Sequence, residues 1–402
     1  MITTHEIGRG RILSLWINYG LSKINISQLI NGLREVRHLK EISMDINYEC
    51  NFSCTYCSYG FKKLHGKELS SNEWESIIND CIDNGVKLFA LAGKEPLIND
   101  KFNEILLYLN RAREVWNKEL IIGLVTNGWF LKEKVDQLIN SGLSYLDVSI
   151  DGHVSVHDVN RKMGSYNRAI EGLLLAQKKG VADKCFVSSV LHAQNYKDIP
   201  QFIRNLYSKG IKNFSISLIY PTPNVSQNLL FSKSELEIFL NDILPETISK
   251  IRDASDLEIV IDIFTASLPF LREMVLEKLI NLDEIHIDDI DSLFNYEVLS
   301  NGCTLYKRFS LDHLTYGKAL KITADGYCMY NYESLTKPDY WNYSLGNVRD
   351  ESISVLHRKL FENNAYIFKL AEQADRKICT EEPCNPLCLG KNNNCSFRRY
   401  IK

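Results

Sequence analysis

The alternation of apolar and polar positions predicts a repeated series of strands and helices from residue 41 onward. "EISMDINY" (41–48) has the period of two that is typical of a half-buried strand. The next segment predicts a helix that begins with a capping box of Ser70 and Glu73 and ends at Gly85. The pattern then continues with predicted strands at 86–92, 120–126, 145–150, 185–191 and 213–219, and predicted helices at 101–116, 130–141, 165–179 and 197–209.

Six strand–helix units in succession predict a parallel sheet with helices packed outside it. They are fewer than the eight of a complete barrel, so the pattern favours either a doubly wound α/β sheet or a partial barrel. Both architectures bind ligands at the C-terminal ends of their strands. Polar motifs stand at these ends: a cysteine loop after the first strand, "GKEP" after the second, "TNG" after the third and "SIDG" at the fourth.

The strand–helix repeat fades after residue 222 and suggests four parts of the chain. Within the third part we expect a helix at 234–251, a strand at 257–264 and a solvated acidic connection at 281–292 rather than a metal site. The predicted parts are an N-terminal helical segment (1–40), the strand–helix domain (41–222), a connecting segment (223–302) and a small cysteine-rich C-terminal domain (303–402).

Composition places the chain among ordinary globular proteins. Of its 402 residues 45% are hydrophobic and 24% are charged, and the net charge of −3 gives no reason to expect nucleic acid as a partner. The N-terminus lacks the features of a signal peptide, and no apolar run is long enough to span a membrane. We therefore expect a cytoplasmic protein, whose reducing surroundings argue against a disulfide framework for its 11 cysteines.

Three cysteines are crowded into the loop after the first predicted strand. Cys50, Cys54 and Cys57 form a C-x3-C-x2-C run. Three thiolates can hold three irons of a 4Fe–4S cluster and leave the fourth iron open to a small molecule. The alternative is a zinc site completed by a distant residue, but the second C-x2-C pair that usually completes such a site is missing from this domain.

With Tyr56 as the aromatic residue of C-x3-C-x-aromatic-C, this run resembles the signature of radical S-adenosylmethionine (radical SAM) enzymes, over roughly residues 41–222. The resemblance implies a partial (β/α)6 TIM-type barrel with a 4Fe–4S cluster at its mouth. It also implies that S-adenosylmethionine chelates the open iron and, after reduction, yields a 5′-deoxyadenosyl radical that abstracts a substrate hydrogen.

The resemblance also implies contacts to the cofactor. "GKEP" resembles the family's glycine-rich motif, although Lys94 stands where a second glycine is usual. Beside Tyr56, the implied cofactor-binding residues are Gly93, Glu95 (to the ammonium group), Asn127 (lining the site), Ser149 and Asp151 (near the ribose), Arg161 (to the carboxylate) and, more weakly, Ser189.

The C-terminal cysteines resemble a SPASM region, a cysteine-rich extension that carries one or two auxiliary 4Fe–4S clusters. The family's two-cluster regions have at least seven cysteines and a different last spacing, so the number of clusters stays open, as does a zinc knuckle. We expect Cys303 and Cys328 to share the cluster nearer the barrel. The predicted auxiliary ligands are Cys303, Cys328, Cys379, Cys384, Cys388 and Cys395.

SPASM-bearing enzymes commonly modify peptides, so the resemblance favours a maturase that crosslinks, oxidises or epimerises a ribosomally made peptide. The alternative substrate is a small molecule such as an aminocyclitol, sugar or nucleoside, and a third hypothesis is an iron–sulfur electron carrier. The expected partner is a reductant such as flavodoxin or ferredoxin. Because only about 40 residues precede the first strand, leader recognition would need the barrel face, the C-terminal region or a separate leader-binding protein.

No catalytic acid, base or radical relay can be assigned from the sequence. Tyr220, His192 and Asp262 lie near predicted strand ends, where packing or a satisfied polar role explains each of them equally well. Cys81 and Cys185 are interpreted as core residues, because free cysteine is usually buried.

Overall fold

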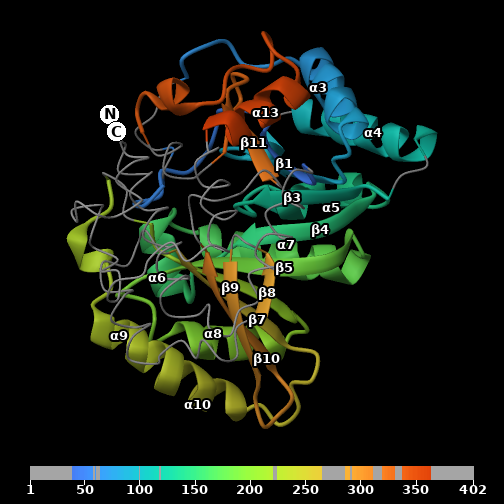
Figure 1. Ribbon diagram of the computed structural model, residues 1–402. Helices are drawn as coiled ribbons and strands as arrows, with labels where there is room; N and C mark the ends of the chain where they lie inside the picture. Colours follow the sequence, from blue (N-terminus) through green and yellow to red (C-terminus); the bar gives the residue numbers. More distant parts are fainter. Residues whose placement is uncertain are drawn as a thin grey trace, which may run out of the picture.

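The computed structural model describes residues 39–57, 59, 64–98, 100–116, 119–220, 224–264, 286–289, 292–310, 319–330 and 337–363. Within these residues one sheet of 12 strands runs through the molecule (Figure 1). Its order is β12-β11-β1-β2-β3-β4-β5-β6-β7-β10-β9-β8. The strands are β1 (Glu41–Asp45), β2 (Leu88–Ala92), β3 (Ile121–Thr126), β4 (Leu143–Ser149), β5 (Ala182–Leu191), β6 (Asn213–Leu218), β7 (Glu258–Phe264), β8 (His286–Asp289), β9 (Ser292–Val298), β10 (Thr304–Ser310), β11 (Ala319–Ile322) and β12 (Cys328–Met329).

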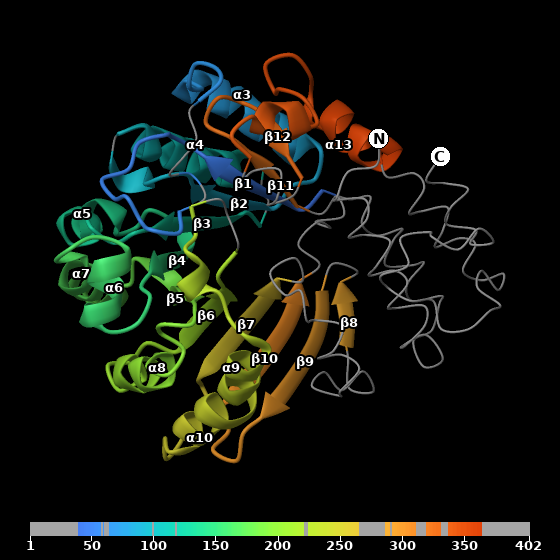
Figure 2. The ribbon, with the colours of Figure 1, turned by 90° about the vertical axis from the view of Figure 1, so that its left-hand side faces the viewer.

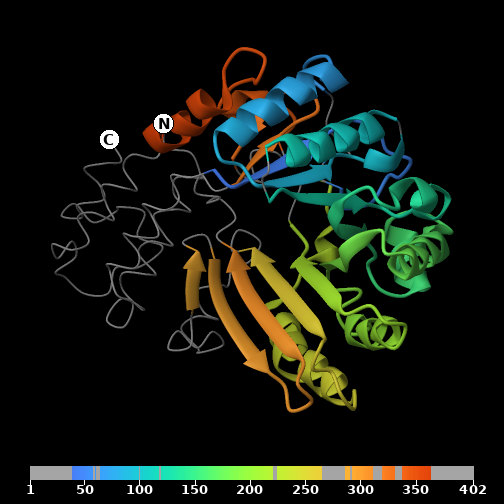
Figure 3. The same ribbon diagram turned by 90° about the vertical axis from the view of Figure 1, so that its right-hand side faces the viewer.

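Helices cover the convex face of this curved sheet, and its concave face is turned away from them (Figures 2 and 3). A π-helical stretch at Phe239–Ile243 joins α9 to α10, so the single helix predicted at 234–251 is built from three pieces. The helices are α3 (Ser71–Asp83), α4 (Lys101–Val115), α5 (Leu131–Leu138), α6 (Val154–Asn160), α7 (Ser165–Lys179), α8 (Ile199–Tyr207), α9 (Lys233–Ile238), α10 (Leu244–Ser249) and α13 (Ile353–Asn363).

The expected α/β architecture is confirmed, and the parallel part of the sheet is longer than predicted. β7 pairs in parallel with β6, and β10 pairs in parallel with β7. At the other end β11 pairs in parallel with β1, through Glu41 and Ala319. The predicted boundary at residue 222 is therefore not where the sheet ends, because segments from the predicted connecting and C-terminal parts extend it on both sides.

The core lies between the sheet and its helices. The capping box of Ser70 and Glu73 is present at the start of α3, as the sequence predicts. α3 then buries Trp74 and Ile78, and β1 buries Ile42 and Met44, in the same apolar cluster. Since alternate strand residues point to opposite faces, burying this face fixes the register of the sheet and leaves the intervening residues to line the concave side.

Several sequence predictions fall partly or wholly on residues that the structure does not describe. Residues 1–38 and the four cysteines from Cys379 to Cys395 lie outside the described residues. The acidic stretch 281–292 was expected to be a solvated connection, but its residues His286–Asp289 form edge strand β8, paired with β9. In the described part of the chain, no helix is both long and apolar enough to cross a membrane.

Candidate active site

Seven of the residues singled out in the sequence meet in one pocket. Its volume is about 180 Å³, and its walls come from the loops after β1, β2 and β3, the end of β4 and the residue after α6. The predicted residues on its wall are Cys50, Cys54, Cys57, Gly93, Asn127, Ser149 and Arg161. The sequence had not singled out the other lining residues as binding groups: Phe52, Ser53, Tyr59, Lys94, Val125 and Thr126.

The cysteine loop is held in shape by distant parts of the chain. Cys57 N donates to Cys54 O at 3.1 Å and closes a turn. Thr55 donates two hydrogen bonds to Asn160 at the end of α6. Its backbone N–H donates to Asn160 O (2.9 Å), and its Oγ1 donates to Asn160 Oδ1 (3.2 Å). The amide of Asn224 donates to the carbonyls of Thr55 and Cys57, both at 3.2 Å. These contacts fix the backbone that presents the three thiols.

The thiols lie in surroundings that oppose charge. Burial raises the pKa of Cys50, although Phe52 N–H, at 3.3 Å from Sγ, and the Asn127 amide, at 3.8 Å, favour its thiolate. Burial also raises the pKa of Cys54 to about 12, against the attraction of Arg161. Thiolate ligands must be deprotonated, so these groups become thiolates when a cation binds them.

These three residues fit a 4Fe–4S cluster. They are thiols, they share one wall of one pocket, and N–H groups are already directed at Cys50 Sγ. Among the described residues no three His, Cys, Asp or Glu side chains converge on a single metal ion. A four-iron cluster places each thiolate on a different iron, so such convergence is not required for it.

Glu95 lies behind the pocket wall and is fully buried. Its Oε1 accepts bonds from Thr126 Oγ1 (2.6 Å) and Leu97 N (3.1 Å), and its Oε2 accepts one from Asn127 N (2.8 Å). Burial raises the pKa of Glu95 to about 6, against these hydrogen bonds. In this structure the carboxylate holds the wall residues Thr126 and Asn127 in place, and its contact to a cofactor ammonium stays a prediction.

Gly93 has a backbone conformation and a close approach that only glycine accommodates without strain. Its φ is +129°, and a Cβ atom there would lie 3.0 Å from Asn47 O and 3.3 Å from Ile46 N. Both neighbours are backbone atoms at the end of β1 and cannot move aside cheaply. Gly93 thus lets the "GKEP" loop pass close to the strand that leads into the cysteine loop.

We expect Gly93→Ala to lower the free energy of unfolding by about 1–3 kcal/mol, the usual cost of a strained backbone position. Gly66→Ala is the matched control, because its Cβ would meet no atom closer than 3.7 Å and its φ is ordinary. Urea denaturation of both variants measures the difference. Equal stability of the two variants would contradict the strain assigned to Gly93.

Asp151 and Arg161 bind each other at the edge of the pocket. Arg161 donates to Asp151 through Nε (2.5 Å) and Nη2 (2.8 Å), Val190 N donates at 2.9 Å, and the Tyr56 hydroxyl also donates. These four bonds engage both oxygens of Asp151. The predicted place of Asp151 near the ribose stays a prediction. Arg161 lines the pocket, whereas Tyr56 is not among the lining residues and contacts Asp151 through its hydroxyl.

The charge of Arg161 dominates this pair. Burial on its own would raise the pKa of Asp151, but the nearby guanidinium and its hydrogen bonds more than offset that effect, so the pKa lies below its usual range. Asp151 is fully buried and the Arg161 side chain is 10% exposed. The pair is thus a buried, bidentate ion pair at the edge of the pocket.

The predicted role of Ser189 is corrected by the register of β5. Its Oγ donates to Ile150 O, its side chain is buried, and it is not among the pocket-lining residues. The neighbouring Ser188 is paired with Ser149, whose side chain lines the pocket. Because successive strand residues face opposite sides, Ser188 lies on the pocket side of the sheet and Ser189 does not.

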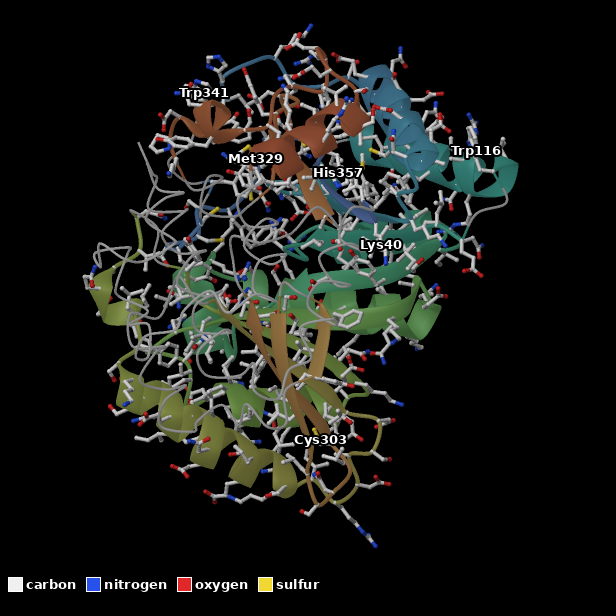
Figure 4. All side chains as sticks on the ribbon, in the orientation of Figure 1. Lys40, Trp116, Cys303, Met329, Trp341 and His357 are labelled. Atoms are coloured by element: carbon white, nitrogen blue, oxygen red, sulfur yellow. The ribbon has the colours of Figure 1, made fainter. Side chains whose placement is uncertain are left out.

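Cys303 and Cys328 do not lie together. Cys303 precedes Thr304, which pairs with Glu258 at the start of β7, whereas Cys328 pairs with Ile322 at the end of β11. Figure 4 shows Cys303 at the far end of the β9–β10 hairpin from Met329, the neighbour of Cys328. Cys303 stands beside the inner strand β10 and Cys328 on the edge strand β12, so the structure does not bring the two together as one shared cluster requires.

Both of these cysteines are fully buried in the core. Cys81 and Cys185 are also buried, which agrees with their interpretation as core residues. Any role of Cys303 or Cys328 as a ligand of an auxiliary cluster stays a prediction.

Residues 44–206 match the family model described as Radical SAM superfamily. A probable GTP 3′,8-cyclase of Methanopyrus kandleri is 26% identical over 191 residues, 47% of this chain and 59% of the relative. An Fe-coproporphyrin III synthase of Methanosarcina barkeri is 30% identical over 174 residues, 40% of this chain and 42% of the relative. The chain spans about half the length of the curated relatives it matches.

Solved structures of similar fold cover more of the chain. SuiB of Streptococcus suis, bound to the precursor peptide SuiA, has a TM-score of 0.58 at 15% identity, over 82% of this chain and 67% of its own. Native anSMEcpe with bound AdoMet has a TM-score of 0.57 at 18% identity, over 83% of this chain and 84% of its own. At such identities the likeness is one of fold.

Proposed function

We propose that Cys50, Cys54 and Cys57 hold a 4Fe–4S cluster beside a bound S-adenosylmethionine, and the match of residues 44–206 to the Radical SAM superfamily model supports this. The observation that carries this proposal is the single pocket shared by the three thiols, Gly93, Asn127, Ser149 and Arg161. When bound, the cluster would pass one electron from a flavodoxin- or ferredoxin-type reductant to the sulfonium, giving methionine and a 5′-deoxyadenosyl radical that takes a hydrogen atom from the substrate.

The protein's own groups serve to bind and position the cofactor. The backbone N–H of Asn127 donates to Glu95, and its Oδ1 accepts from Trp129 N at 2.9 Å. Its Nδ2 donates to Asn51 Oδ1 at 3.0 Å and lies 3.8 Å from Cys50 Sγ. Arg161, held by Asp151, leaves part of its guanidinium on the pocket wall for an anionic group. Ser149 offers a hydroxyl to a polar ligand, and the backbone of Gly93 admits close approach.

We propose a ribosomally made peptide as the substrate, modified by crosslinking, oxidation or epimerisation. Support comes from the solved structures of similar fold, one of which is bound to its precursor peptide. Some of the cysteines after residue 300 bind one or two auxiliary clusters.

A small molecule is the second candidate substrate, and a specific observation favours it. The curated relatives that match this chain include proteins described as GTP 3′,8-cyclase, which act on a nucleotide. A nucleoside or sugar would need no leader-binding partner. The two candidates differ in which pool of molecules donates the abstracted hydrogen.

Deuterium transfer to 5′-deoxyadenosine separates the two substrate classes. Cells that carry the gene are grown in heavy water, and their extract is divided into a peptide fraction and a small-molecule fraction. Reduced, anaerobically reconstituted protein with unlabelled S-adenosylmethionine in light water is expected to give 5′-deoxyadenosine one mass unit heavier with the peptide fraction. Labelling only from the small-molecule fraction would favour the second candidate. The absence of any 5′-deoxyadenosine would favour an iron–sulfur carrier and overturn the proposal.

A further inference from the structure

One partly buried carboxylate next to the pocket, that of Asp147, is not used by the cofactor site described above. Asp147 is paired in register with Val125, which lines the pocket, and it precedes Ser149, another lining residue, by two positions on β4. Paired residues of parallel strands face the same side of the sheet, as do residues two apart in one strand. Asp147 therefore lies on the same concave face as Ser149, about 7 Å closer to the N-terminal end of β4.

Ser188 holds the carboxylate on one side only. Its Oγ donates to Asp147 Oδ2 at 2.8 Å, from the position paired with Ser149. The other oxygen, Oδ1, is shielded from solvent and accepts no hydrogen bond from any residue that the structure describes. A buried carboxylate oxygen without a donor is costly, and such groups are usually satisfied by a partner.

Aromatic rings lie next to Asp147 on the same face of the sheet. Tyr145 precedes it by two positions on β4, and Phe186 is its paired residue on β5. Tyr145 and Phe186 meet edge to face, with centroids 6.3 Å apart and planes at 87°. Gly123 makes room for this arrangement, because a Cβ atom there would lie 1.8 Å from Tyr145 Cζ. Asp147 thus lies between these rings and the pocket-lining Ser149 on the same face of the sheet.

The charge state of Asp147 suits an acceptor. Burial raises its pKa to about 6, against the hydrogen bond from Ser188 and the charge of Arg161, so the group is mainly a carboxylate at neutral pH. A carboxylate only accepts hydrogen bonds, so its complement is a hydroxyl, an amide N–H or an ammonium group.

On the basis of the proposed function, we infer that Asp147, oriented by Ser188, binds the substrate through a hydroxyl, amide N–H or ammonium group of that substrate. This contact would hold the reacting C–H next to the Tyr145 and Phe186 rings and beside the cofactor pocket. A peptide segment provides such donors in its backbone and in its serine, threonine or lysine side chains.

The test compares Asp147→Asn and Ser188→Ala with the wild type, using the perdeuterated fraction that labels 5′-deoxyadenosine. A hydrogen bond to a charged group contributes enough that each variant should lose about 10- to 100-fold in deuterium transfer. Both variants are expected to form unlabelled 5′-deoxyadenosine without extract at close to the wild-type rate. Asp136→Asn is the control, because that carboxylate is 82% exposed on α5, outside the pocket.

Three outcomes would overturn the inference. Wild-type deuterium transfer in Asp147→Asn would show that the carboxylate does not bind the substrate. Loss of S-adenosylmethionine cleavage without extract in both variants, with the iron content intact, would assign the pair to the cofactor site instead. No labelling of the wild type by either fraction would defeat the proposed function itself, and the inference with it.

Discussion

Replacing Cys50, Cys54 and Cys57 together by alanine is expected to reduce 5′-deoxyadenosine formation to the level of a sample without protein. The three thiols share one pocket wall, and at positions 50, 54 and 57 alanine offers no ligand to iron. The measurement is 5′-deoxyadenosine released from S-adenosylmethionine after anaerobic reconstitution and reduction, with iron determined on the same sample. Iron retained by this variant reports the auxiliary clusters: about four atoms per chain for one cluster and about eight for two.

Cys185→Ala is the matched control for that loss. Cys185 is a buried thiol on β5 that is not among the pocket-lining residues. Its removal is expected to cost some stability but to leave cleavage unchanged once the variant is folded. Cleavage retained by the triple variant would refute the assignment of these cysteines.

Asp151→Ala is expected to lower the free energy of unfolding by about 3–5 kcal/mol, because it leaves the Arg161 guanidinium buried and unpaired. The Tyr56 hydroxyl and Val190 N–H lose their acceptor as well. Urea denaturation at neutral pH measures the effect. The control is Glu171→Ala, which breaks the exposed ion pair with Lys132 and is expected to leave stability unchanged within error.

The loss in Asp151→Ala should shrink at low pH. The pKa of Asp151 is lowered in the folded state, so the contribution of the pair is fully present above the ordinary value of 3.8 and is lost as the pH falls through the lower folded pKa. The stability curves of the wild type and the variant should therefore converge below that ordinary value. A constant difference across the acid range would argue against an ionised Asp151.

The features predicted best are those written locally in the sequence. Cys50, Cys54 and Cys57 occupy one short loop, so any fold that closes the loop after β1 brings them together. The motif alone indicated a resemblance to radical SAM enzymes, and residues 44–206 match the model of that superfamily. The capping box at Ser70 was predicted for the same reason, because both partners lie within one turn.

The features predicted worst depend on contacts between distant segments or on a shift of one residue. Nothing local announces that Ala319 pairs with Glu41, so the extension of the sheet by β11 was missed. Ser188 and Ser189 are chemically identical, and only the register of β5 decides which one faces the pocket. Asp151 and Arg161 are separated by α6, so their pairing depends on where that helix places the arginine, which the two motifs do not indicate.

Electron paramagnetic resonance of the reduced protein, with and without S-adenosylmethionine, tests the central claim most directly. If the cluster held by Cys50, Cys54 and Cys57 has an open iron, adding S-adenosylmethionine should change the spectrum of the reduced 4Fe–4S signal in the wild type. The triple alanine variant, whose remaining signals come only from auxiliary clusters, should show no change. A wild-type spectrum that is indifferent to S-adenosylmethionine would contradict the account.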